Sequence, residues 1–397
     1  MKNLGIYVHF PFCVSKCRYC NFCSETGKEN RQVEYIQCLL SEIKRNAKYC
    51  NSYKVDTIYM GGGTPSNMFD GAIATVLQQI KDSFYVDKNA EISIECNPNS
   101  LTYQKAMEWK QAGVNRVSVG LQTSNDKVLK TIGRSHTSAD YFNAIDVLKQ
   151  AGFENINVDL MVGLPKMKLS DVRVTLKHVL RSGVSHVSCY SLILEEGTPL
   201  YYDVAKGLVK LPKEEKTLGM YNYVYKVLQE NGYHRYEVSN FALKNCECKH
   251  NVHTWQMQEY MGFGCASHSF MNVSHVDERV LQMADNVPDN KFVRFHNAEK
   301  VDEYIKLVSS GKSPVVGCES LSIADMLEEY IMLSMRLSSG ISNQFIKQNY
   351  GVDFFEAKNA IIQNLIRLKL VECNGDNLYA TDLGFTLLNK VILDLVS

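Results

Sequence analysis

Residues 6–20 read IYVHFPFCVSKCRYC, an apolar strand followed at once by three cysteines, Cys13, Cys17 and Cys20. Three thiolates can hold three irons of a [4Fe–4S] cube and leave the fourth iron open to a small molecule. Zinc, which prefers four ligands in tetrahedral geometry, and ordinary buried thiols are the alternatives. No second pair of ligands with finger-like spacing lies nearby, so we expect a cluster.

This strand opens a longer pattern. From Leu4 to about Asn231, short β-branched runs alternate with longer helical patterns, which is typical of βαβ units around a parallel sheet. The predicted strands are Gly5–Phe10, Thr57–Met60, Glu91–Glu95, Arg116–Leu121, Asn155–Met161 and His186–Leu194. Polar or permissive residues lie near the carboxyl end of every predicted strand: the three cysteines, Gly61–Thr64, Glu95, Gln122, Asp159 and Tyr190. Closed eight-strand barrels of βα units place their chemistry at the carboxyl ends of the strands. We expect the same of a partial barrel with six strands, so the site should lie at these ends.

Bulk composition excludes several classes of protein. The 397 residues carry 43 Lys and Arg against 43 Asp and Glu, so no basic excess favours nucleic acid as a partner. No apolar run approaches the roughly 20 residues that span a bilayer, and residues 1–10 lack the pattern of a secretory signal. We therefore expect a cytoplasmic protein without stable membrane insertion.

The run Cys13–Cys20 resembles the CxxxCxφC motif of the radical S-adenosylmethionine superfamily, in which φ is aromatic and corresponds to Tyr19. In that superfamily S-adenosylmethionine chelates the open iron through its amino and carboxylate groups. The resemblance implies a (β/α)6 partial barrel, with Tyr19 shielding the cluster from water. The strand at residues 6–12 is similar to the entry strand of the branch that contains oxygen-independent coproporphyrinogen III dehydrogenases and the HemW heme chaperones, and the resemblance to HemW covers nearly the whole chain.

The same resemblance implies a set of S-adenosylmethionine contacts: Tyr7, Gly62, Gly63, Thr64, Glu95, Gln122, Arg134 and Asp159. Alternatives exist for several of them. The glycine loop can be a plain tight turn, and Tyr7 can be ordinary core packing. A strand-end carboxylate must find donors, because burying it unpaired costs several kcal/mol, and a nearby lysine or helix N-terminus would serve as well as a ligand. Whether a second S-adenosylmethionine binds is left open.

Two positions separate the two branches. The dehydrogenases carry a fourth cysteine two residues after the third, where HemW-type proteins and this chain carry phenylalanine, here Phe22. Cys23 falls one position later and is interpreted as an extra thiol. The dehydrogenases also carry a sizeable segment ahead of the first strand that helps to enclose the tetrapyrrole, and here the strand begins near residue 4.

The second half points to heme. Residues 236–242 (YEVSNFA), 248–255 (CKHNVHTW) and 260–269 (YMGFGCASHS) resemble three stretches of HemW, with Thr254 replacing a usual tyrosine. Imidazole beside aromatic and small residues suits axial ligation of heme iron. The resemblance implies His250 as the heme ligand, the alternative being a histidine satisfied inside the fold. Cys248, His253 and His268 are lesser candidates.

We expect three segments: the barrel at 1–232, an irregular extension at 233–320 and a winged-helix-like helical domain at 321–397. The leading hypothesis is a heme chaperone that carries a [4Fe–4S] cluster and S-adenosylmethionine, with heme or a porphyrin, heme-acceptor proteins and an electron donor as partners. The rival is a dehydrogenase that oxidatively decarboxylates coproporphyrinogen III. The sequence leaves open whether the protein is an enzyme and assigns no catalytic side chain.

Overall fold

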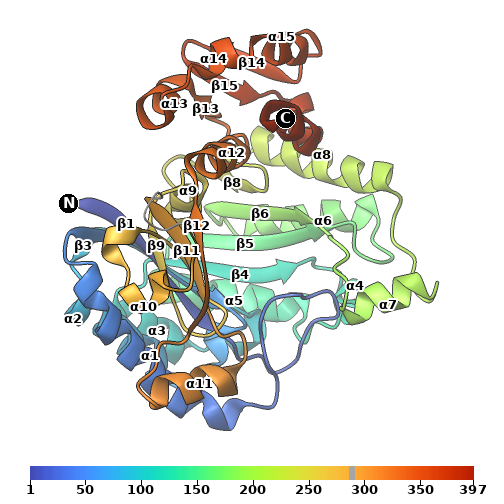
Figure 1. Cartoon of the computed structure of the whole chain (residues 1–397). Coiled ribbons are helices and arrows are strands. Elements are labelled where there is room, and N and C mark those ends of the chain that lie inside the picture. The colour runs from blue at the N-terminus through green and yellow to red at the C-terminus, as the bar shows by residue number, and fades with distance from the viewer. Residues whose placement is uncertain (286–290) are drawn as a thin grey trace.

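The computed structural model describes residues 1–285 and 291–397, and its centre is one twelve-stranded mixed sheet (Figure 1). Six parallel strands are consecutive in it: β1 (Lys2–Phe10), β2 (Tyr53–Gly62), β3 (Val86–Cys96), β4 (Arg116–Gln122), β5 (Asn155–Val162) and β6 (His186–Ser191). The helices that follow them are α1 (Gln32–Asn46), α2 (Ala72–Ser83), α3 (Tyr103–Ala112), α4 (Asp126–Thr131), α5 (Ser138–Gln150), α6 (Leu169–Arg181), α7 (Pro199–Ala205) and α8 (Glu214–Glu230). The sheet is not closed, and β12 and β7 form its edges. The predicted α/β fold with a (β/α)6 partial barrel is confirmed.

Side chains alternate between the two faces along most of these strands, with register shifts at Leu4/Gly5, Val55/Thr57 and Gly120/Gln122. In β1 the residues Ile6, Val8 and Phe10 are fully buried in the apolar layer under the helices, while Tyr7 and His9 point to the other face. A parallel sheet covered on both faces usually carries continuous apolar runs. Here the inner face is polar instead, with Thr57, Glu91, Glu95, Arg116, Ser118, Asn157, Asp159 and His186 contributed by β2 to β6. The inner face is therefore built to surround polar groups.

Residues 233–320 continue the same sheet at both of its sides. Their elements are β7 (His234–Arg235), β8 (Asn240–Ala242), α9 (Lys249–Trp255), β9 (Tyr260–Phe263), β10 (His268–Asn272), α10 (Glu278–Leu281), β11 (Phe292–Asn297), α11 (Val301–Ser309) and β12 (Val315–Leu321). Strand β8 pairs antiparallel with β6, and β9 pairs parallel with β1. The segment is more regular than the irregular extension that we expected, because strands of two to seven residues are too short to show a clear periodicity in the sequence.

The C-terminal residues form a second hydrophobic core on one side of the sheet (Figure 1). Their elements are α12 (Ile323–Ser334), β13 (Ile341–Ser342), α13 (Asn343–Tyr350), α14 (Phe354–Ala357), α15 (Asn359–Arg367), β14 (Val371–Asn374), β15 (Asn377–Ala380), α16 (Asp382–Thr386) and α17 (Leu388–Val396). A hairpin joins β14 to β15, and the two strands belong to a three-stranded sheet with β13. Among the described residues, every helix is too short or too polar to cross a bilayer.

Candidate functional site

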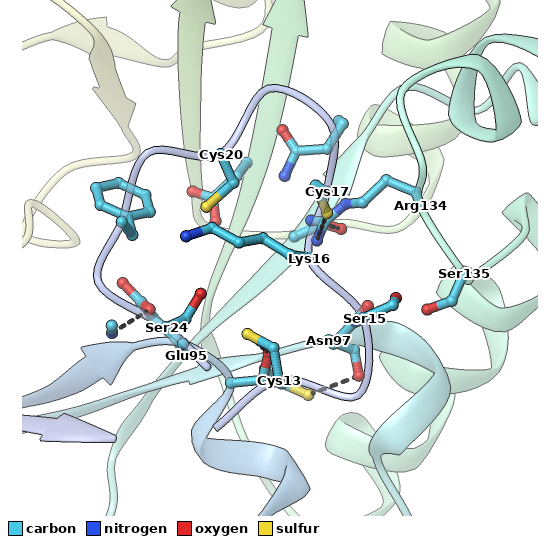
Figure 2. A pocket seen from close by; sticks show the side chains of 18 of the residues that line it. Cys13, Ser15, Lys16, Cys17, Cys20, Ser24, Glu95, Asn97, Arg134 and Ser135 are labelled. Atoms are coloured by element: carbon cyan, nitrogen blue, oxygen red, sulfur yellow. Dashed lines mark hydrogen bonds between the residues drawn. The ribbon is translucent and has the colours of Figure 1, made fainter. Parts of the chain in front are cut away.

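A cavity lies at the carboxyl ends of β1 to β5, and the loop between β1 and α1 covers it (Figure 2). Its wall contains eleven of the residues predicted for the cluster and S-adenosylmethionine: Cys13, Cys17, Tyr19, Cys20, Gly62, Gly63, Thr64, Glu95, Gln122, Arg134 and Asp159. We call it the first cavity. Of the predicted residues, Tyr7 and His250 do not line it and belong to a second cavity described below.

The three predicted cluster cysteines all reach the first cavity. The Sγ of Cys13 lies 3.4 Å from Thr64 Oγ1, and Arg134 Nη1 donates to Cys17 Sγ at 3.7 Å. Burial raises the pKa of the Cys20 thiol. The thiolate is the form of cysteine that binds metal.

Two further cysteines lie close to this loop without joining the set. Cys96 reaches the wall of the first cavity, but its Sγ donates to the Asn97 carbonyl at 3.4 Å and burial raises its pKa to about 12, so it remains a thiol at neutral pH. Cys23 lines the second cavity. Cys13, Cys17 and Cys20 thus remain the three cysteines of the predicted set, and all three line the first cavity.

The glycine loop after β2 is fixed by its neighbours. Gly62 N–H donates to Glu95 Oε2 at 3.1 Å, Gly63 N–H to the Phe10 carbonyl at 2.8 Å, and Thr64 N–H to the Phe12 carbonyl at 3.0 Å. A Cβ on Gly63 would lie 2.7 Å from the Phe10 oxygen, so only glycine allows this approach. The N–H groups of the loop are therefore satisfied within the fold.

Two partly buried carboxylates, Glu95 and Asp159, line the first cavity. Glu95 accepts hydrogen bonds from Tyr59 Oη at 3.0 Å and from Gly62, and burial, reinforced by the negative charge of Asp159, raises its pKa to about 7. Burial also raises the pKa of Asp159, although Asn157 and Ser118 donate to it at 2.8 and 3.1 Å. Neither carboxylate has a lysine partner or a helix N-terminus among the described residues, as the alternative interpretation required. A cationic ligand beside them would stabilise the ionised form of both carboxylates.

Unpartnered polar atoms surround the first cavity. Within the described residues, the buried Ser24 Oγ, Asn97 Oδ1 and Arg134 Nε lack a hydrogen-bond partner, and all three residues line the wall (Figure 2). Gln122 adopts φ of 66°, a left-handed conformation that costs a non-glycine residue about 1–3 kcal/mol and is concentrated at functional sites. Donors, acceptors, carboxylates and a guanidinium together fit a zwitterionic, sulfonium-bearing ligand beside a cluster.

The second cavity lies beside the first and contains Tyr7, His9, Cys23, His250, Thr254, Tyr260, Ala266 and His268, with Phe22 in the wall of both cavities. His250, on α9, shares a hydrogen bond of 3.0 Å between its Nδ1 and Thr57 Oγ1. Burial lowers the pKa of His250 to about 3, so its ring is neutral at physiological pH. Its Nε2 makes no hydrogen bond within the described part of the chain. A neutral imidazole with one nitrogen anchored and the other free is suited to ligate iron.

The two cavities are connected through Tyr59. Its ring stacks on His250, with centroids 5.3 Å apart, and on Tyr7 at 6.4 Å, while its hydroxyl donates to Glu95. Tyr7 itself is hydrogen-bonded to His9 Nδ1 at 2.9 Å. Tyr7 therefore lies one ring away from the S-adenosylmethionine candidates with which the sequence grouped it.

The lesser heme candidates differ in access. Both ring nitrogens of the buried His253 face protein acceptors, the Glu259 carbonyl at 2.8 Å and Asp56 at 3.5 Å. Cys248 is fully buried beside Glu91, and burial raises its pKa to about 12. Of the three, only His268 lines the second cavity, where it stacks on His296 at 5.2 Å.

Glu91 is a site residue that sequence reasoning missed. Its carboxylate accepts from the backbone N–H groups of Lys249 at 3.0 Å and His250 at 3.2 Å, which are the first residues of α9. A carboxylate at a helix N-terminus is stabilised by the unpaired N–H groups and the helix dipole. The only sequence signal was a charged residue at the start of a predicted strand, two pleats before Glu95.

We predict that Glu91→Gln destabilises the protein by about 1–3 kcal/mol, because an amide cannot accept all of these hydrogen bonds and turns a donor toward the N–H groups. Urea unfolding followed by circular dichroism measures the difference. Glu230→Gln, at an exposed pair with Lys226, is the matched control and should change stability by less than about 1 kcal/mol. Equal stability of Glu91→Gln and wild type would contradict the role given to Glu91.

Comparisons with known proteins show which family the chain resembles over its whole length. Residues 7–179 match the Radical SAM superfamily, and residues 321–387 match the HemN C-terminal domain. The chain is 32% identical to the heme chaperone HemW of Lactococcus lactis, over 98% of this chain and 96% of that protein. It is 30% identical to the heme chaperone HemW of Bacillus subtilis, over 97% of each. Coproporphyrinogen III oxidase (HemN) of Escherichia coli has the same fold, with a TM-score of 0.82, 21% identity, and coverage of 100% of this chain and 90% of that one.

Proposed function

Since the chain belongs to the radical S-adenosylmethionine superfamily and, within it, to the family of the heme chaperone HemW, we propose that it binds heme and delivers it to acceptor proteins. Heme binds in the second cavity with His250 as axial ligand. The single observation that carries the proposal is the buried, neutral His250, anchored at Nδ1 and free at Nε2, in a cavity separate from the three cysteines.

In this proposal the first cavity holds the cofactors. Cys13, Cys17 and Cys20 bind a [4Fe–4S] cluster, which supplies single electrons when reduced by a donor protein. Glu95 and Asp159 face the cationic part of S-adenosylmethionine, and the orphan Arg134 Nε suits its carboxylate. Gln122, Gly62, Gly63, Thr64 and Tyr19 complete the wall.

The chain's three segments take separate roles in this proposal. Residues 1–232 hold the cofactors. Residues 233–320 supply the heme ligand, His250 on α9. Residues 321–397 form the C-terminal helical domain with its own hydrophobic core. We place the protein in the cytoplasm, as its composition suggests.

We predict that His250→Ala weakens heme binding by more than about tenfold, that is by more than about 1.4 kcal/mol. Titration of the anaerobically reconstituted protein with hemin, followed by the Soret band, measures this. His234→Ala, at an exposed histidine paired with Glu247, is the matched control and should bind heme as wild type does. Wild-type affinity of His250→Ala would contradict the assignment.

The low pKa of His250 gives a second expectation for the same titration. An exposed histidine loses its ligand form as the pH falls through about 6.5. Because the pKa of His250 is about 3, heme affinity should stay flat between pH 8 and about 5.5. The folded protein holds His250 neutral, whereas the unfolded chain binds a proton to it below about pH 6.5. The contribution of His250 to folding stability is therefore complete above about pH 6.5 and declines as the pH falls toward 3. A histidine in a salt bridge shows the opposite dependence.

The same preparation tests the rival function. Coproporphyrinogen III is incubated with the reconstituted protein, S-adenosylmethionine and an electron donor. Formation of protoporphyrinogen would overturn the chaperone proposal, whereas heme uptake without turnover supports it.

A further inference from the structure

A third cavity of about 320 Å³ lies between β9 to β11 and α12, and its lining is mainly apolar. Met257, Phe270, Met332 and Leu333 form most of it, with Thr254, Tyr260, Arg294 and Glu329 at its polar positions. Its size falls within the range of about 300–1,000 Å³ that is typical of ligand pockets. None of its lining residues lines the first cavity.

The third cavity adjoins the second one. Thr254 and Tyr260 line both, and the second cavity adds about 390 Å³. Thr254 lies four residues after His250 on α9 and donates to the His250 carbonyl at 3.1 Å, so the two side chains occupy the same face one turn apart. One helical turn rises about 5.4 Å, which is comparable to the distance from the metal of a porphyrin to its outer carbons. A flat ligand centred at His250 would therefore reach the third cavity past Thr254.

The charges in the third cavity exclude carboxylates. Arg294 is its only cation among the described lining residues, and Glu329 already binds it through two contacts, of 2.9 and 2.5 Å. Glu319 adds a third contact at 3.2 Å, so the cluster carries one negative charge more than positive. A ligand carboxylate would meet apolar side chains and an excess of negative charge, and its desolvation would be uncompensated.

Met257 is an apolar residue of this wall that adopts an unfavourable backbone conformation. It follows the end of α9 with φ of 53°, a position that glycine usually occupies at helix ends. A non-glycine residue in this conformation costs about 1–2 kcal/mol. The chain keeps a long apolar side chain there, where it lines the third cavity.

We propose that the third cavity receives the carboxylate-free edge of the porphyrin bound at His250, which bears vinyl and methyl groups, and so selects heme over tetrapyrroles with carboxylates on all four pyrrole rings. This inference rests on the proposed heme binding. Two residues determine this specificity. Thr254 is small enough to leave the passage between the second and third cavities open, and Met332 lies in the outer wall of the third cavity.

The test compares hemin with iron coproporphyrin III, which carries four propionates, by titration of the reconstituted full chain. Wild type should bind hemin at least about tenfold more tightly. Met332→Lys places a cation at this wall and should narrow or reverse the preference, whereas Met283→Lys, at an exposed methionine outside the three cavities, should keep it. Circular dichroism verifies that each variant is folded.

The outcomes separate the two proposals. Absence of binding of either porphyrin to wild type would overturn the proposed function and this inference together. Binding of both with equal affinity, or an unchanged preference in folded Met332→Lys, would overturn this inference alone. The wild-type comparison decides by itself should Met332→Lys fail to fold.

Discussion

Replacement of Cys13, Cys17 and Cys20 together by alanine should abolish the brown colour and the bound iron of protein reconstituted without oxygen. The three sulfurs line one cavity, and Arg134 donates to one of them. Removing them leaves no set of thiolates there, so the loss should be complete. Absorbance near 400 nm and iron analysis measure it.

Cys23→Ala is the matched control for this experiment. Cys23 lies three residues after Cys20, yet it lines the second cavity, so its removal should leave colour and iron unchanged. Loss of the cluster in Cys23→Ala, or retention of colour in the triple variant, would contradict the assignment of ligands. The pair of results also distinguishes three ligands from a general dependence on cysteine in this loop.

Gly62→Ala should destabilise the protein by about 2–5 kcal/mol. Gly62 adopts φ of 111°, and a Cβ there would lie 2.3 Å from the ring of His9. That ring cannot move aside easily, because Tyr7 Oη and the Cys23 carbonyl hold its nitrogens at 2.9 and 2.7 Å. Urea unfolding measures the loss of stability. Since Gly62 lines the first cavity and His9 the second, the variant should also bind less iron on reconstitution and bind hemin more weakly.

Gly71→Ala separates backbone strain from the clash. Gly71 also has a positive φ, of 88°, but no atom lies within 4 Å of the position that an alanine methyl group would take, so only the conformational cost of about 1–2 kcal/mol applies. Similar losses of stability in the two variants would show that the His9 contact is unimportant.

The alternation of short β-branched runs with longer helical patterns made the parallel sheet predictable. Sequences such as IYVHF and EISIE place apolar side chains under the helices and polar ones inside. Residues 233–320 gave no such signal because their strands contain few alternations. In the C-terminal domain the backbone leaves helical geometry at Lys358, between α14 and α15, and at Leu387, between α16 and α17.

The cavity around the three cysteines was also predictable, because the carboxyl ends of parallel strands meet at one edge and bring distant residues such as Glu95 and Asp159 together. Tyr7 was grouped with them because the family resemblance implied it, and sequence could not show which cavity its ring faces. Glu91 and Tyr59 gave no separate signal, since their roles depend on contacts with a helix more than 150 residues away.

The sequence by itself determined the alternation that builds the sheet and the three thiols that a cluster requires, because both depend on the spacing of nearby residues. Only the tertiary structure decided that α9 crosses the polar inner face, that His250 is neutral with a free nitrogen, and that an apolar cavity adjoins it at Thr254. These properties depend on burial and on contacts between segments far apart in the chain, which local spacing does not encode.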